Sequence, residues 1–495
     1  MASSGSSSYM IYHPENLKIS DIFSILVFGR SLEGSGIVEC SSQEIKAAES
    51  LLDNFITLLS LILQKIFIWI SGPMALLGFI IDFTLNLFAL NGGILGLPIR
   101  IITGSLVITK RDSADYQSII GCIDDRKSLQ NSYLSSLPMV KILIHGIQFI
   151  NPLDLCMMAS KVSYENEAYV KYIVTNYWKM HFVGFYNCWN GSLKKSDTQA
   201  FVFCDAPENA EMIVVAFRGT ELFNFRDWAT DIDLSWLSLG EIGKVHVDFM
   251  KALGLKKDAK DAETGWPKEY TGDKVLAYYT IREKLRQLLE QNPNAKLLVT
   301  GHSLGGALAI VFPAILVYHQ ENSILDRLLG VYTFGQPRVG DKEFGDSMEK
   351  QLNGTSRRYY RVVYRYDTVP RVPSNGLILH FSHFGGCIYY KSWYKSQILK
   401  EEPDKNYFNP LFFPSLYINA WLDLFRGLFA GIRHGKGFTE NWTSIGLRLF
   451  GLFIPGFASH SPRDYVNTTR LGNIEIMEEE EEDNIYDLKR STVAV

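Results

Sequence analysis

A chain of 495 residues is too long for one simple hydrophobic core, and its length predicts a large domain with additional segments. Hydrophobic residues make up 47% and aromatic residues 13% of the sequence, which predicts either a large core or surfaces that contact lipid. The net charge is -4, and no basic cluster is interleaved with aromatic residues. The sequence therefore lacks the usual signature of a nucleic-acid-binding protein.

The cysteine pattern and the first residues bear on the cellular compartment. Six cysteines are scattered without a CxxC pair or the spacing of metal ligands: Cys40, Cys122, Cys156, Cys188, Cys204 and Cys387. The N-terminal stretch MASSGSSSYMIYHPENLK is polar and does not resemble a secretory signal. Together these features predict a reducing, cytosol-facing location with free thiols.

Residues 1–50 are mixed and polar, and residues 51–110 form an apolar region that we expect to anchor the protein to a lipid droplet or membrane. The uncharged runs 66–81 and 83–99 are each shorter than the roughly 20 residues that span a bilayer, and both contain Gly and Pro. This pattern favours a kinked hairpin or a half-inserted element, with a pair of buried core helices as the alternative. Asp82, between the two runs, argues against one long span.

Residues 111–200 connect this region to a domain at 201–472 in which predicted strands alternate with predicted helices. Apolar, β-branched runs predict strands at 211–217, 295–300, 328–335 and 357–367. Helical periodicity covers 268–293, and residues 304–319 read as a helix with an internal proline. This alternation implies an α/β fold with a mainly parallel sheet.

Two further segments follow inside and after this domain. Residues 405–457 form an insertion rich in Phe, Leu and Trp, which we expect to be a second lipid contact. Residues 473–495 carry a run of glutamates and predict a solvated acidic tail.

The segment LLVTGHSLGGALAIV at 297–311 places Ser303 between two glycines, directly after an aliphatic run. A strand, a GxSxG turn and a helix are the context of a nucleophile elbow. Gly301 and Gly305 suit this turn because side chains there would collide with neighbouring backbone. Leu304 begins the helix, so its backbone N–H is expected to donate to a developing oxyanion. We therefore predict that Ser303 is a nucleophile, with a purely structural turn as the alternative.

Four sequence blocks resemble the class 3 lipases, an α/β-hydrolase family of triacylglycerol lipases. They are VVAFRGT, VTGHSLGGALA, VYTFGQPRVGD and RYDTVPRVP, in this order within roughly residues 200–470. The apolar N-terminal region and the long C-terminal insertion narrow the resemblance to plant oil-body lipases. The resemblance implies an α/β-hydrolase fold and ester hydrolysis by a Ser-Asp-His triad, with no cofactor or metal.

An acyl-transfer serine needs a base, and the base needs an acid that fixes its tautomer. Asp367 follows a predicted strand, where sheet enzymes place catalytic groups, and it matches the family's acid position. Asp341 and Asp346 are its rivals, although their segment RVGDKEFGD reads as a surface loop and a helix cap.

The base is predicted from its sequence block. His460, in FASHSPRDYV, resembles the family block that carries the general base, and the apolar insertion accounts for its separation of 93 residues from Asp367. His383 is the alternative. The other histidines considered are His380 and His434, and two that we expect to be structural, His302 and His246.

The resemblance also implies a second oxyanion donor and a lid. The hydroxyl residue after Arg-Gly in FRGT is Thr220, which takes the donor position in class 3 lipases. The segment after it matches the position of the lipase lid, a short amphipathic helix over the serine. Written as a helix, it carries four apolar residues on one face: Phe225, Trp228, Ile232 and Trp236.

We therefore predict a serine lipase that hydrolyses triacylglycerol, and di- and monoacylglycerol, at the cytosolic surface of a lipid droplet or the endoplasmic reticulum. Its predicted partners are acyl lipids and a lipid surface. A phospholipase A1 or galactolipase is the nearest alternative, and a non-catalytic lipid-droplet protein is an alternative of another class. A complete Ser, Asp, His and Thr set speaks against the last one.

Overall fold

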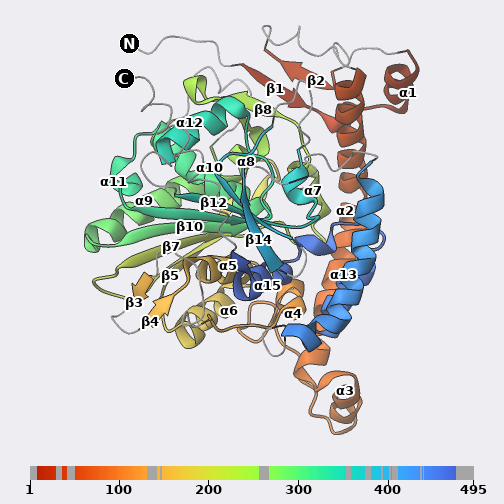
Figure 1. The fold of residues 1–495 in the computed structure, drawn as a ribbon, viewed down its shortest axis with the longest axis vertical. Helices are drawn as coiled ribbons and strands as arrows, with labels where there is room; N and C mark the ends of the chain where they lie inside the picture. The colour runs from red at the N-terminus through yellow and green to blue at the C-terminus, as the bar shows by residue number, and fades with distance from the viewer. Residues whose placement is uncertain are drawn as a thin grey trace, which may run out of the picture.

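The computed structural model describes residues 8–28, 36–41, 51–130, 142–144, 148–255, 267–352, 358–373, 381–391, 394–400, 403, 411–434, 438 and 440–474. A nine-stranded sheet forms its centre, in the order β15-β14-β13-β12-β11-β10-β7-β6-β5 (Figure 1). The strands are β5 (His181–Asn190), β6 (Lys195–Cys204), β7 (Met212–Phe217), β10 (Lys296–His302), β11 (Leu328–Phe334), β12 (Tyr359–Tyr364), β13 (Gly386–Tyr390), β14 (Lys395–Leu399) and β15 (Asn473–Ile474).

The five central strands, from β7 to β13, run parallel to their neighbours. Antiparallel pairs extend the sheet at both sides, with β5 and β6 beyond β7 and with β14 beyond β13. The prediction of an α/β fold with a mainly parallel sheet is therefore confirmed. The predicted strands at 211–217, 295–300, 328–335 and 357–367 correspond to β7, β10, β11 and β12.

Side chains that alternate along each central strand divide the core into two layers. Val215 and Val299 pack with α8 (Val247–Ala252), α9 (Ala277–Gln291) and α10 (Leu304–Tyr318) on one face. Val214 and Leu298 pack with α5 (Pro152–Val162), α6 (Glu167–Tyr172) and α15 (Pro462–Leu471) on the other. The sheet is thus covered on both faces, as a parallel sheet requires.

The apolar N-terminal region forms one long helix, α2 (Leu51–Leu90), followed by the short α3 (Gly93–Ile102). The expected kinked hairpin is wrong, since α2 runs through Pro73 and through Asp82, whose carboxylate pairs with Arg111 at 3.1 Å. Burial in the core is wrong as well, because Trp69 on α2 is 82% exposed. Among the described residues, one helix, Phe55–Leu90, is long and apolar enough to cross a membrane.

A second, four-stranded sheet lies beside α2 and contains β1 (Tyr9–Tyr12), β2 (Val38–Cys40), β8 (Trp236–Ser238) and β9 (Lys244–His246). Pairing of β1 with β8 joins Tyr9 and Met10 to the hydrolase region. The small helix α1 (Ile19–Phe28) packs with α2.

The apolar insertion forms α13 (Phe413–His434) and α14 (Trp442–Phe450). In Figure 1, α13 and α2 both run along one side of the molecule, outside the central sheet. The remaining helices are α4 (Ile119–Ile123), α7 (Phe225–Asp231), α11 (Asn322–Leu325) and α12 (Lys342–Leu352). The predicted acidic run lies outside the described residues.

Candidate active site

Ser303 lies at the turn between β10 and α10, at the carboxyl end of a central strand. Its φ of +60° and ψ of -133° are strained values for a residue with a side chain. A Cβ atom at Gly301 would lie 2.1 Å from the carbonyl oxygen of Gly305, and one at Gly305 would lie 2.3 Å from that of Phe217. Both positions therefore need glycine, and the turn has the geometry that the sequence predicted for a nucleophile elbow.

The structure brings Ser303, His460 and Asp367 together in one hydrogen-bonded series. Nε2 of His460 is 2.8 Å from Oγ of Ser303, and its Nδ1 is 2.8 Å from Oδ2 of Asp367. All three side chains are buried. Asp367 follows β12 and His460 lies in a short 3-10 helix, Ala458–His460, directly before α15. The segment between Asp367 and His460, which lie 93 positions apart, therefore folds so that the histidine returns to the acid.

Asp367 has more hydrogen bonds than the triad alone requires. The hydroxyl of Tyr465 donates to Oδ2, and the backbone N–H of Val369 donates to Oδ1 at 2.9 Å. Burial, followed by the negative charge of Asp367, raises the pKa of Tyr465 well above its ordinary value, so its phenol remains a donor. These bonds hold the carboxylate in one orientation toward His460.

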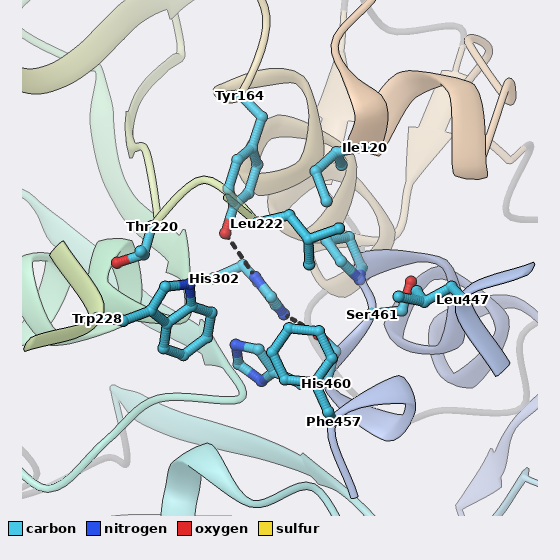
Figure 2. Close-up of a pocket in the computed structure, with 11 residues that line it drawn as sticks. Ile120, Tyr164, Thr220, Leu222, Trp228, His302, Leu447, Phe457, His460 and Ser461 are labelled. Carbon is cyan, nitrogen blue, oxygen red and sulfur yellow. Dashed lines mark hydrogen bonds between the residues drawn. The ribbon is translucent and has the colours of Figure 1, made fainter. Parts of the chain in front are cut away.

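His302 lies close to the hydrogen-bonded series without joining it. It contacts the backbone of His460. Its Nε2 lies 2.9 Å from the backbone oxygen of His460, and its Nδ1 lies 2.9 Å from the hydroxyl of Tyr164, as Figure 2 shows. Burial, and next the neighbouring His460, lowers the pKa of His302 well below its ordinary value. A neutral His302 can then donate from Nε2 and accept at Nδ1, which fixes the backbone of His460.

The other histidines do not join the site in the described structure. Nε2 of His383 is 2.8 Å from the backbone oxygen of Pro370. Nε2 of His246 is 2.8 Å from the backbone oxygen of Asp233, and burial lowers the pKa of His246 to about 4. His380 and the side chain of His434 lie outside the described residues. Asp341, a rival acid, accepts hydrogen bonds from the backbone N–H groups of Lys244 and Phe344.

The two predicted oxyanion donors, Leu304 and Thr220, both lie next to residues of the hydrogen-bonded series. Leu304 is the first residue of α10, so its N–H has no carbonyl acceptor within the helix. Thr220 follows β7 and lines the pocket beside His460, and its hydroxyl donates to Oδ2 of Asp231 at 2.7 Å. Sequence reasoning missed Asp231 as the partner of Thr220, because the two residues are related only by the fold of the loop.

The pocket beside His460 is small and lined mainly by apolar side chains. Trp228, Leu222 and Phe457 line it together with Ile120 of α4 and Leu447 of α14 (Figure 2). The ring of Trp228 lies 6.1 Å from that of His460 and 5.7 Å from that of Phe457. The free volume is about 20 Å³, which is room for roughly one water molecule.

The helix α7 is shorter than the sequence suggested. Phe225 and Trp228 lie in it, but it ends at Asp231, so Ile232 is its C-terminal cap. Placing Trp236 on the same helix is wrong, because Trp236 belongs to β8 and pairs with Met10 and His246. The physical reason is that polar and apolar residues alternate after Asp231, a period that fits a strand.

Sequence reasoning also missed a glycine behind the triad. Gly335 has a φ of +57°, and a Cβ atom there would lie 2.8 Å from Oδ2 of Asp367 and 3.0 Å from Cε1 of His460.

Within the described part of the chain there is no group of three or more His, Cys, Asp or Glu side chains placed to hold a metal ion.

The sequence of this chain is similar to the sequences of known lipases. The family model for lipase (class 3) matches residues 214–376. Triacylglycerol lipase OBL1 of Nicotiana tabacum is 38% identical over 94% of this chain and 95% of its own length. Triacylglycerol lipase OBL1 of Arabidopsis thaliana is 41% identical over 84% of this chain and 85% of its own length. The solved native Rhizomucor miehei lipase propeptide complex is 25% identical, covers 45% of this chain and 62% of that chain, and has a TM-score of 0.34. The chain has the α/β-hydrolase fold and belongs to the class 3 lipase family, together with the plant triacylglycerol lipases OBL1.

Proposed function

We propose that this chain is a serine lipase that releases fatty acids from triacylglycerol at the surface of a lipid droplet. The observation that carries the proposal is the buried series Ser303, His460 and Asp367, joined by hydrogen bonds beneath an apolar pocket. Membership of the class 3 lipase family supports the same reaction class.

In the proposed reaction, Ser303 Oγ attacks the ester carbonyl while Nε2 of His460 takes the serine proton. Asp367 accepts the hydrogen bond from Nδ1 and stabilises the imidazolium that forms. The carbonyl oxygen gains negative charge and is stabilised by the N–H of Leu304 and by Thr220. His460 then gives its proton to the departing glycerol oxygen. Water repeats the sequence on the acyl-enzyme and releases the fatty acid.

The small volume of the pocket implies that α7 has to move before an acyl chain can enter. A cavity of about 20 Å³ cannot hold an acyl ester, and Trp228 of α7 covers His460. The indole N–H of Trp228 is buried and has no acceptor among the described residues. Because an unpaired buried donor costs about 1–3 kcal/mol, the closed position of α7 carries a penalty that its opening removes.

The opposite side of α7 packs on the long apolar helix α2. The rings of Phe67 and Phe225 meet edge to face at 5.3 Å, and Oγ of Ser60 donates to the backbone oxygen of Ile232 at 2.7 Å. A Cβ atom at Gly78 would lie 2.7 Å from Cβ of Phe223. The proposed lid is therefore in contact with the catalytic histidine on one side and with α2 on the other.

A lipid surface suits the outer sides of α2, α3, α13 and α14. Large apolar side chains there are exposed, among them Trp69, Leu76, Ile102, Phe429 and Trp442. With 40 residues, α2 is about 60 Å long, twice the roughly 30 Å of a bilayer's hydrocarbon core. Since one side of α2 packs on the enzyme, we propose that the helix lies along the lipid surface and does not cross a bilayer.

The test compares the purified wild type with Ser303→Ala on a trioleoylglycerol emulsion and on phosphatidylcholine vesicles. We expect fatty acid release from the emulsion by the wild type only, with equal melting temperatures for the two proteins. Release from vesicles alone would replace the triacylglycerol lipase by a phospholipase. Equal release by both proteins, or none by either, would refute the serine lipase.

A further inference from the structure

A buried carboxylate on α13 lies at the centre of a cluster of polar side chains. Asp423 is 2% exposed. Its Oδ1 accepts from Arg365 at 3.0 Å and from Arg426 at 2.7 Å. Its Oδ2 accepts from the hydroxyl of Ser459 and from the amide of Asn419, both at 3.1 Å. We call these five residues the Asp423 cluster.

Two members of the Asp423 cluster are close neighbours of triad residues in the chain. Ser459 directly precedes His460, and Arg365 lies two residues before Asp367. One carboxylate thus joins the segment that carries the proposed base to the segment that carries the proposed acid. Base and acid are 93 residues apart in the sequence, so only tertiary contacts can set their distance.

The backbone at Arg365 needs such a contact. Its φ is +42°, in the left-handed region that residues with a side chain rarely adopt. A strained conformation persists only where surrounding contacts hold it. The ion pair with Asp423 and the hydrogen bond from Arg371 to the Arg365 carbonyl at 2.9 Å supply such contacts.

Asp423 also differs in character from the rest of its helix. Trp421 and Phe425 flank it on α13 and are each 52% exposed. Charges are costly to bury unless partners compensate them. The four donors around Asp423 offset part of this cost, and burial still raises the pKa of Asp423 above its ordinary value. The helix therefore has an apolar outer side and, on its inner side, a charge that connects it to the site.

We propose that Asp423 is a positioning residue for the reaction: from α13 it holds the His460 segment and the Asp367 segment in register. The apolar insertion then completes the active centre in addition to contacting lipid. This inference rests on the proposed function, because it assigns a role relative to the proposed base and acid.

The test uses the purified full chain, a soluble short-chain ester such as p-nitrophenyl butyrate, and titration of active sites with a fluorophosphonate. We expect Asp423→Asn to lower kcat per titrated site at least tenfold and to change KM less than about twofold. The same substitution in an Asp367→Asn background should lower kcat less than about threefold, because the link to the acid is already lost. A purely structural residue would lower the amount of titrated enzyme and leave kcat per site unchanged.

Glu321→Gln is the matched control. Glu321 is likewise a buried carboxylate that pairs with arginine, at 2.6 Å from Arg286, but it lies beyond the far end of α10. We expect it to lower the melting temperature and to leave kcat per site within twofold of wild type.

Ser459→Ala keeps the inference testable if Asp423→Asn does not fold, since it removes one hydrogen bond and leaves the ion pairs in place. We expect its kcat per site to fall about threefold to tenfold. A wild-type kcat per site in Asp423→Asn, or in Ser459→Ala where Asp423→Asn cannot be purified, would overturn the role of Asp423. Loss of ester hydrolysis in Ser303→Ala shows separately that the proposed function holds.

Discussion

Asp231 couples the proposed oxyanion donor Thr220 to pH. Its Oδ2 accepts the hydroxyl of Thr220 at 2.7 Å, while its Oδ1 is buried and has no partner within the described part of the chain. Burial raises the pKa of Asp231 to about 7; the hydrogen bond from Thr220 opposes this effect and the charge of Asp248 adds to it.

The protonation state of Asp231 decides where the Thr220 proton points. An ionised Asp231 only accepts, so the Thr220 proton faces away from the substrate. A protonated Asp231 can donate to Thr220 Oγ1, which frees the hydroxyl proton to turn toward the oxyanion. Loss of one oxyanion donor costs about 100- to 1,000-fold in kcat. We therefore expect kcat to fall by up to roughly this factor as the pH rises through about 7.

The same pKa has a consequence for stability. A pKa raised from 3.8 to about 7 means that the folded protein binds more protons than the unfolded chain between these values. The stabilisation that these bound protons add to the free energy of unfolding is fully present below the pKa of the unfolded state. It is lost as the pH rises through the pKa of the folded state. Its size is about 3 pKa units, or roughly 4 kcal/mol at 1.36 kcal/mol per unit.

Asp231→Asn tests both consequences, because its amide can donate to Thr220 Oγ1 at every pH. We expect a flatter decline of kcat on a soluble ester between about pH 6 and 8, and a weaker pH dependence of the free energy of urea unfolding. Asp227→Asn is the control. Burial also raises the pKa of Asp227, but its carboxylate accepts a hydrogen bond from Asn224 instead of from Thr220. That control should change the stability profile alone. An Asp231→Asn enzyme with the wild-type decline of kcat would refute the reasoning.

Three further predictions concern the acid, the pocket and the lipid surface. Tyr465→Phe removes a hydrogen bond to the Asp367 carboxylate, worth about 1.5–3 kcal/mol for a charged acceptor, so kcat per titrated site should fall roughly tenfold or more; an unchanged kcat would contradict this. Leu447→Trp narrows the pocket, so the ratio of butyrate to oleate ester hydrolysis should rise, whereas a constant ratio would place the acyl chain elsewhere. Trp69→Ser removes an exposed apolar side chain from α2, so flotation with lipid droplets should decrease about tenfold, and undiminished flotation would exclude this contact.

Local sequence signals, together with the family resemblance, were enough to single out Ser303 and Asp367, which the structure joins through His460. Around Ser303, the aliphatic strand, the two glycines and the apolar helix all act within 15 residues, and each favours the same turn. Asp367 was predicted from its position directly after a strand, which the structure shows as β12. Such signals depend on the backbone conformation of neighbouring residues, which is the same in the folded protein as the local sequence predicts.

Two predictions of helix extent differ from the structure. The apolar spacing up to Trp236 fits a helix, but the alternation after Asp231 also fits a strand, and in the structure Trp236 pairs with β1. For the apolar region, Asp82 separates two runs whose Gly and Pro residues favour a kinked hairpin. In the structure α2 continues through Pro73 and Asp82, and Asp82 pairs with Arg111.

Contacts between distant segments could not be predicted from one sequence. The bond between Tyr164 and His302 joins residues 138 positions apart, and that between Asp423 and Arg365 joins residues 58 positions apart. Each of these residues reads as an ordinary polar residue in its own segment. Their roles become visible only after the sheet and the insertion have folded together.

Covalent labelling of Ser303 tests the central claim most directly. The purified full chain would be treated with a fluorophosphonate and its tryptic peptides examined by mass spectrometry. We expect one adduct, on Ser303, that is absent in Ser303→Ala and forms much more slowly in His460→Ala. Labelling of a different residue, or an unlabelled Ser303 in an enzyme that hydrolyses esters, would contradict the proposed catalytic set.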